Sequence, residues 1–166
     1  SNHMSNLLVQ NIKHTNGTTA IAVDSSGNTT QSGFVTKPAH PAFCGTSSTQ
    51  QGSGNYYFTT YTVTGTGYFN RGGHFNATTG VFTAPVDGAY HFGFIFRDTQ
   101  NTTNRKYGYL EISCCDFSEV AEASDMYADI GGSITLELSA NDEVRLATHP
   151  AGAYFQVAIF SGFLVG

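Results

Sequence analysis

Apolar and polar residues alternate in short runs along most of the chain, and Gly, Asn, Pro and Ser separate the runs. In the longest run, 89–97, every second residue is aromatic: Tyr90, Phe92, Phe94 and Phe96. Because successive side chains of a strand point to opposite faces, these four rings share one face. Packing in a core is the simplest interpretation of this stripe. Helical periodicity is weak, and only 117–126 could hold a short helical turn.

The rest of the second part of the chain follows the same pattern, at the spacing of a β-sandwich. Further strands are predicted at 41–45, 56–63, 67–70, 81–83, 106–114, 133–138, 143–148 and 154–165. Residues 76–80 form a predicted turn, and polar loops are expected at 46–55, 98–104 and 116–129. The pattern therefore predicts an all-β head domain over residues 41–166.

Residues 5–40 form a β-rich leader and linker. Short β-prone runs between residues 7 and 31 are broken by Asn16-Gly17 and by the turn at 25–28, which predicts two or three small strands. The leader holds too little apolar material for a core of its own, so it is expected to need neighbouring chains. Residues 32–40, with Pro38, are the predicted linker.

Composition and charge support the all-β interpretation and exclude two classes of partner. Only 11% of the residues are charged, whereas 13% are aromatic and 19 are Gly, as suits short strands and tight turns. The net charge is −5 and the seven Lys and Arg residues are scattered, which argues against nucleic acid. No apolar run approaches the roughly 20 residues that span a bilayer.

Catalytic and metal-binding motifs are missing from the sequence, so no enzymatic function is predicted. The six His residues form no pair at helical spacing beside a carboxylate, and no Gly-x-Ser-x-Gly or phosphate-binding loop occurs. Cys44, Cys114 and Cys115 are an odd number without Cys-x-x-Cys spacing, and free thiols are expected. Asn16, Asn28, Asn76 and Asn101 each begin an Asn-x-Thr sequon, which matters only in a secreted eukaryotic protein.

Several separated motifs resemble the globular head of complement C1q, whose fold is shared by the tumour-necrosis-factor ligands. They are Tyr68-Phe69-Asn70, His74-Phe75-Asn76, the run 79–92 (TGVFTAPVDGAYHF), 132–138 (GSITLEL) with 141–144 (NDEV), and 160–165 (FSGFLV). The similarity covers about residues 41–166. It implies a ten-stranded jelly roll that assembles as a homotrimer and binds ligands through exposed loops without catalysis.

The closing strand carries the predicted trimer contacts, because it is apolar on both faces. By parity, Ala158, Phe160 and Leu164 share one face, and the other bears Val157, Ile159, Phe163 and Val165. A strand that is apolar on both faces is expected when one face packs in its own protomer and the other against neighbours. The second set is the predicted trimer interface.

Ligand-binding candidates come from the polar loops and the tyrosines beside them. They are Thr46, Asn55, Tyr56, Tyr57, Asp98, Asn101, Asn104 and Tyr127. Small polar groups beside flat rings suit a glycan better than an apolar peptide, although ordinary solvated turns would look the same. No cofactor is required. Acidic residues in 116–129 form either a solvated loop or a calcium site, with Asp116, Glu119 and Asp125 as the candidate ligands.

Three settings are compatible with such a head. The leader from Asn11 to Asn28 is similar to short β-rich leaders of bacteriophage tail-fibre and other virion proteins. This similarity, with no collagen repeat and no secretion signal in the sequence, favours a virion head that attaches to a host surface glycan or protein and contacts other virion proteins. The alternative is a secreted C1q-domain lectin of an invertebrate immune system. A purely structural fibre plug would differ only in lacking a binding site.

Overall fold

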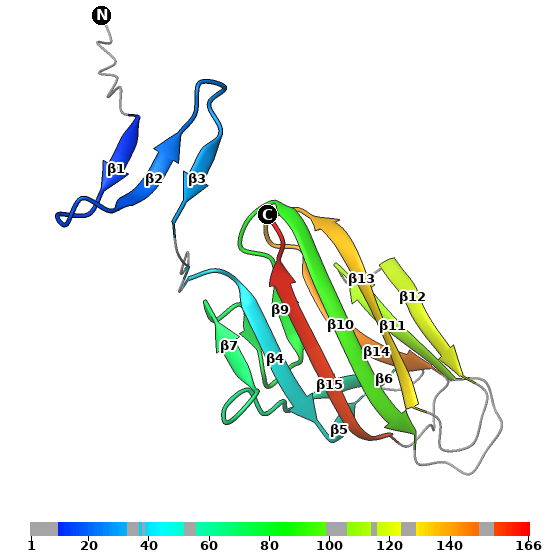
Figure 1. Cartoon of the computed structure of the whole chain (residues 1–166). Coiled ribbons are helices and arrows are strands. Elements are labelled where there is room, and N and C mark those ends of the chain that lie inside the picture. The colour runs from blue at the N-terminus through cyan, green and yellow to red at the C-terminus, as the bar shows by residue number, and fades with distance from the viewer. Residues whose placement is uncertain are drawn as a thin grey trace, which may run out of the picture. The chain divides into compact units, whose positions relative to one another are not determined.

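The computed structural model describes residues 10–32, 37, 39–51, 56–98, 106–113, 116–123, 129–149 and 155–166. The chain divides into two compact units, Ser1–Lys37 and Pro38–Gly166. All regular elements of the described residues are β-strands (Figure 1). None of these residues belongs to a helix that could cross a membrane.

The first unit is a small antiparallel sheet of three strands in the order β1-β2-β3. The strands are β1 (Asn11–Lys13), β2 (Thr19–Val23) and β3 (Thr29–Gln31). Tight turns join them where the sequence predicts, and the Asp24 carboxylate accepts hydrogen bonds from the backbone N–H groups of Ser26 and Asn28. The leader therefore has the two or three small strands expected of it.

The second unit, called the head below, has twelve strands in its described residues. They are β4 (Ala42–Ser47), β5 (Thr49–Gln51), β6 (Tyr56–Thr59), β7 (Phe69–Arg71), β8 (Phe75–Asn76), β9 (Val81–Thr83), β10 (Gly88–Asp98), β11 (Lys106–Ile112), β12 (Asp116–Ala123), β13 (Asp129–Leu138), β14 (Glu143–His149) and β15 (Phe155–Leu164).

The head strands form two sheets that pack face to face (Figure 1). The five-stranded sheet has the order β13-β10-β15-β4-β7. The seven-stranded sheet runs β12-β11-β14-β6-β5, and β9, with β8 beside it, also pairs with β14. Every pairing is antiparallel, and the long strands β10 and β15 lie next to each other in full register from Tyr90↔Leu164 to Arg97↔Val157. This is the jelly-roll sandwich that the sequence predicts.

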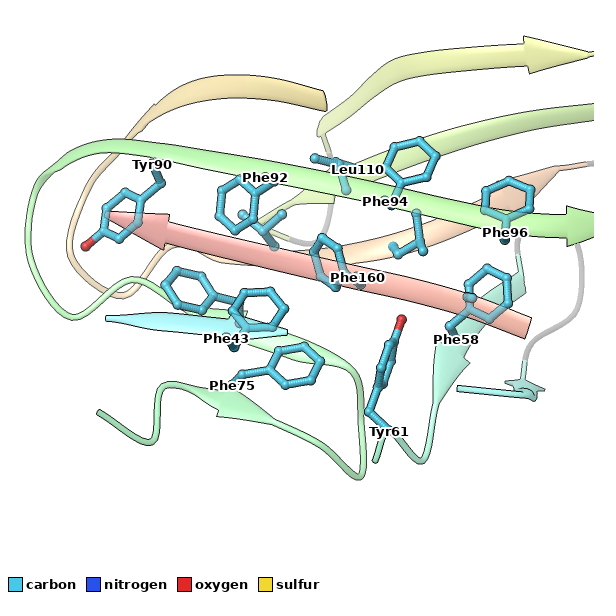
Figure 2. Packing of buried hydrophobic residues seen from close by; sticks show 14 of the residues in the cluster. Phe43, Phe58, Tyr61, Phe75, Tyr90, Phe92, Phe94, Phe96, Leu110 and Phe160 are labelled. Atoms are coloured by element: carbon cyan, nitrogen blue, oxygen red, sulfur yellow. The ribbon is translucent and has the colours of Figure 1, made fainter. Parts of the chain in front are cut away.

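Aromatic side chains from both sheets fill the core (Figure 2). The predicted stripe on β10 is confirmed, because Tyr90, Phe92 and Phe96 are at most 1% exposed and Phe94 is 6% exposed. Phe160 of β15 lies fully buried among them. The ring of Phe43 stacks on Phe75 with 4.1 Å between centroids and meets Phe160 edge to face at 5.0 Å. The inward set of the closing strand is therefore correctly assigned.

A glycine at the end of the 76–80 turn allows the chain to reverse beneath the core. Gly80 has φ +74°, and a Cβ at this position would lie 2.2 Å from the carbonyl oxygen of Phe58. No side chain fits that space, because the opposing atom is backbone. The predicted turn is thus built on a position that only glycine occupies without distortion.

Two of the expected loops are wrong in their secondary structure. Residues 46 and 47 belong to β4, and Thr49–Gln51 forms β5, a hairpin partner of β6. The buried Ser47 hydroxyl holds this bend, since its oxygen accepts the N–H of Thr49 and its O–H donates to the carbonyl of Thr59. Sequence gave no sign of β5 because the segment is polar throughout.

The acidic connection at 116–129 is also wrong as a loop, and so is the helical turn at 117–126. Asp116–Ala123 forms β12, which pairs with β11 from Ile112↔Asp116 to Lys106↔Ala123, and Asp129 opens β13. Backbone hydrogen bonds from β11 stabilise this edge strand despite its acidic composition. An extended strand does not wrap several carboxylates around one ion as the expected loop would.

Candidate functional site

Apolar side chains gather on the surface of the five-stranded sheet that faces away from the core. Val157, Phe163, Val165 and Ile95 are 44%, 46%, 58% and 47% exposed, and Ile159 is partly exposed. These five residues are called the apolar face. Cross-strand pairing places Ile95 opposite Ile159 and puts Phe163 opposite His91, whose ring centroid is 5.5 Å from that of Phe163. Contiguous exposed apolar surface of this kind marks interaction sites.

One end of the apolar face is hollowed into a groove of about 300 Å³. An ion pair lies at its edge: Arg97 Nε is 2.7 Å from Asp129 Oδ1, and Nη2 is 3.0 Å from Oδ2. The hydrogen bond from Arg97 lowers the pKa of the Asp129 carboxyl. The groove is lined by Ile95, Phe96, Arg97, Asp129, Val157 and Ile159.

Small residues cross the middle of the same face, between its two apolar ends. Gly93 of β10 lies opposite Ser161 of β15, which in turn lies opposite Cys44 of β4. The Ser161 hydroxyl donates to the carbonyl oxygen of Gly93 at 3.2 Å. Partial burial raises the pKa of the Cys44 thiol. The middle of this face is therefore formed by small side chains.

The outward surface of the seven-stranded sheet carries a different cluster, centred on a buried carboxylate. Glu111 of β11 is 2% exposed and accepts a hydrogen bond from the Tyr57 hydroxyl at 2.6 Å. Its other oxygen accepts from Arg145 Nε at 2.6 Å, and the Arg145 guanidinium lies over the Tyr57 ring, 3.5 Å from its centroid. Nearby on β11, the rings of Tyr107 and Tyr109 are 5.8 Å apart.

This cluster changes the role of Tyr57 and adds two residues that sequence analysis missed. Tyr57 was expected to offer a stacking surface to a ligand, but its ring and hydroxyl are engaged by Arg145 and Glu111. The sequence signal for the missed pair was faint: Glu111 lies in 106–112, which also holds Lys106, and Arg145 lies in 143–148, which also holds Glu143, so neither charge stands alone in its strand. Only the cross-strand pairing Glu111↔Arg145 brings them together.

The remaining ligand candidates fall in several places. Thr46 lies in β4 and exchanges two backbone hydrogen bonds with Thr62, at 3.1 and 2.8 Å, so it is not in a loop. Tyr56 begins β6 and Asp98 ends β10, with side chains outside the described set. The candidates outside the described residues are Asn55, Asn101, Asn104 and Tyr127.

The calcium candidates are likewise not assembled into a site by the described residues. Asp116 and Glu119 lie in β12 with undescribed side chains, and Asp125 is outside the described residues. Among the side chains that the structure does describe, no group of three or more His, Cys, Asp or Glu could hold a metal ion. Calcium binding stays a prediction.

Three of the four sequon asparagines are described and exposed: Asn16 and Asn28 lie between strands of the leader, and Asn76 ends β8. The side-chain oxygens of Asn16 and Asn76 accept the backbone N–H of Thr18 and Thr78, each at 3.0 Å, and Asn28 donates to Asp24 at 2.9 Å. These bonds are the turn-forming contacts typical of Asn. They explain the positions without requiring a glycan.

Comparisons with known proteins agree with this fold. Residues 43–165 match the C1q domain family. The chain is 35% identical over 101 residues to Protein HP-25 homolog 1 of Bos taurus, covering 58% of this chain and 47% of that protein. It is 31% identical over 101 residues to the hibernation-associated plasma protein HP-25 of Tamias sibiricus, covering 58% and 46%. The chain therefore spans about half the length of these two relatives.

Solved structures share the architecture at low sequence identity. The globular domain of zebrafish complement 1qA protein superposes with a TM-score of 0.55 at 21% identity, covering 76% of this chain and 98% of that one. Murine APRIL gives a TM-score of 0.59 at 11% identity, covering 75% and 99%. The jelly-roll fold predicted from sequence is confirmed.

Proposed function

Because the chain belongs to the C1q domain family, we propose that it is a non-enzymatic recognition domain that works as a homotrimer in a secreted protein. Trimer assembly is typical of this family, and its members are generally non-enzymatic. The observation that carries the proposal is the apolar face on β10 and β15.

The apolar face is suited to packing against further copies of the head. Four of its five members are 44–58% exposed in the protomer, although they lie in the neighbouring strands β10 and β15 or, for Val165, directly after β15. Burying a Val, Ile or Phe side chain contributes about 1.5–3 kcal/mol. A trimer assembled through this face would bury these side chains in all three of its protomers. Val157, Ile159, Phe163 and Val165 are the trimer-interface residues of the proposal.

Recognition is proposed for surfaces that a trimer built on the apolar face leaves open. One candidate is the predicted polar loop at 98–104, and another is the outward surface beside Tyr57 and Arg145, whose side chains contact each other and Glu111. Tyr and Arg are the residue types most enriched where binding energy concentrates. A glycan or a protein fits this polar, aromatic surface, and three weak sites on one trimer would combine their affinities.

The extracellular setting rests on the relatives. One of them is a plasma protein by name, and the relatives support the secreted alternative better than the virion hypothesis, to which they give no support. Secretion is therefore the proposed localisation.

The trimer is tested by light scattering coupled to size exclusion on the full chain at micromolar concentration. The parent is expected to have three times the mass of the chain. Val157→Ser removes a contact of the apolar face, and Val86→Ser is a matched control, because Val86 is 48% exposed but lies outside that face. We expect the first variant to dissociate on dilution and the second to behave as the parent. A monomeric parent, or equal effects of the two variants, would contradict the proposal.

Ligand binding is tested by screening the trimer on a glycan array and then replacing residues 98–104 with a Gly/Ser linker of equal length. Retained trimer mass and melting temperature control for folding. Loss of binding in the loop variant is expected. Undiminished binding would exclude this loop as the binding site and favour the surface around Tyr57.

A further inference from the structure

The leader sheet has ordered strands but no interior. No residue described between 10 and 32 is buried, and Ile12 is 52% exposed. The strand pairing places Ile12 directly opposite Ile21, and Val23 follows on the same face of β2. These three residues are called the leader face. They form a small apolar surface in which Ile21 and Val23 are only partly buried.

Such a sheet does not hold its structure by itself. Its strands have three, five and three residues, and a sheet of this size needs a packed apolar face to be stable in water. The backbone hydrogen bonds between the strands do not compensate, because each replaces a bond to water and contributes little net free energy. The leader face therefore needs a cover.

The charges of the leader do not oppose packing of one leader face against the leader faces of other copies of the chain. Lys13 and Asp24 are the only residues of 10–32 with a formal charge, and they have opposite signs. The carboxylate of Asp24 accepts hydrogen bonds from the Asn28 side-chain amide and from backbone N–H groups of its own turn, and these bonds lower its pKa. The formal charges of each leader thus sum to zero over residues 10–32, so three leaders carry no net charge that would repel one another.

The linker enters the head next to the apolar face, so a head trimer built on that face would bring the three leaders close to one another. β4 starts at Ala42, which pairs with Phe163 of the apolar face, and the carbonyl oxygen of Pro41 accepts the N–H of Leu164. In a trimer built on that face, three chains leave the heads beside the shared interface. Ten residues, 32–41, separate β3 from β4 and can reach at most about 35 Å. The tether raises the effective concentration of the leaders to the millimolar range.

We propose that the leaders of three copies of this chain pack their leader faces together into one small trimeric β-structure. The proposal rests on the head trimer proposed above, and the leader then acts as a second, weaker clamp on the assembly. Each leader face is thus covered by the same segment of the other two copies.

Trypsin cleavage after Lys13 reports on this packing in the full chain. Lys13 lies in β1, and it is the one productive tryptic site before the head, because Lys37 precedes Pro38. In the parent trimer we expect slow cleavage at Lys13. Ile21→Asp places a charge in the leader face, and cleavage is expected to become more than about tenfold faster. Thr30→Asp is the matched control, since Thr30 is exposed and pairs with Ala22 on the opposite face; its rate should equal that of the parent.

A second comparison separates the two proposals. The double variant Val157→Ser/Phe163→Ser keeps the leader intact and is designed to yield monomeric heads, with folding checked by circular dichroism. Rapid cleavage at Lys13 in this monomer, with slow cleavage in the parent trimer, would support leader association. A trimeric parent that is cleaved as fast as Ile21→Asp, or a monomer in which Lys13 stays protected, would overturn it while leaving the head trimer standing. A monomeric parent would instead refute the head trimer.

Discussion

Replacing Phe160 with Ala removes a ring at the centre of the aromatic core. Phe160 is fully buried, and its ring centroid lies 5.0 Å from that of Phe43 and 6.0 Å from those of Phe75 and Phe92 (Figure 2). Truncation loses the transfer free energy of the ring and leaves a cavity, which together cost about 3–5 kcal/mol. Edge-to-face and stacked pairs add about 0.5–1.5 kcal/mol each, so the upper part of this range is expected.

A loss of that size is a large part of the 5–15 kcal/mol that stabilises a typical domain. For a head of this length it corresponds to a melting temperature lowered by roughly 10–20 °C. Urea unfolding followed by tyrosine fluorescence measures the free energy directly, because the chain has nine Tyr and no Trp. The measurement is repeated at several protein concentrations to separate protomer stability from trimer stability.

Phe163→Ala is the matched control on the same strand, because Phe163 lies three residues away on the opposite face and is 46% exposed. Phe160→Ala should lower stability at every concentration. Phe163→Ala should act chiefly through the trimer, with an effect that grows on dilution. If Phe160→Ala melted within a degree or two of the parent, the assignment of the two faces would be wrong.

Three further predictions concern single positions. Gly80→Ala should strongly destabilise the head in urea unfolding, because its new Cβ would collide with the Phe58 carbonyl oxygen; a stability equal to that of the parent would contradict the turn geometry. Arg145→Met should cost about 3–5 kcal/mol by leaving Glu111 buried without its cation, and adding Glu111→Gln should recover part of the loss. The raised pKa of the Cys44 thiol leaves less thiolate at pH 8, so iodoacetamide should alkylate it more slowly than free cysteine, with the rate rising toward pH 10; peptide mass spectrometry measures this, and a rate equal to that of free cysteine would argue against burial.

The periodic part of the fold was predictable from sequence because it is encoded in neighbouring residues. The stripe on β10 and the two faces of β15 follow from alternation alone, which fixes the side of the sheet on which each side chain lies. The turn at Asn16-Gly17 and the reversal at Gly80 follow from the backbone freedom of glycine. The motifs of 79–92 and 160–165 then identified the arrangement of the strands.

The strands β5 and β12 were not predictable in the same way. β5 is entirely polar and β12 is rich in acidic residues, so both resemble solvated loops in composition. Each becomes a strand because an adjacent strand offers free backbone hydrogen-bonding groups, β6 in one case and β11 in the other. Whether a neighbouring strand has free backbone groups depends on the tertiary structure. It therefore places little constraint on the side chains of β5 and β12.

The cluster of Tyr57, Glu111 and Arg145 depended on tertiary structure entirely. Arg145 lies 34 residues from Glu111, and Tyr57 lies 54 residues from it, so no local spacing connects the three. The sequence by itself determined which residues of each strand face inward, because that choice follows from the two-residue period. Only the registers among β6, β11 and β14 decided which outward side chains meet, because strand register is set by the packing of the whole sandwich.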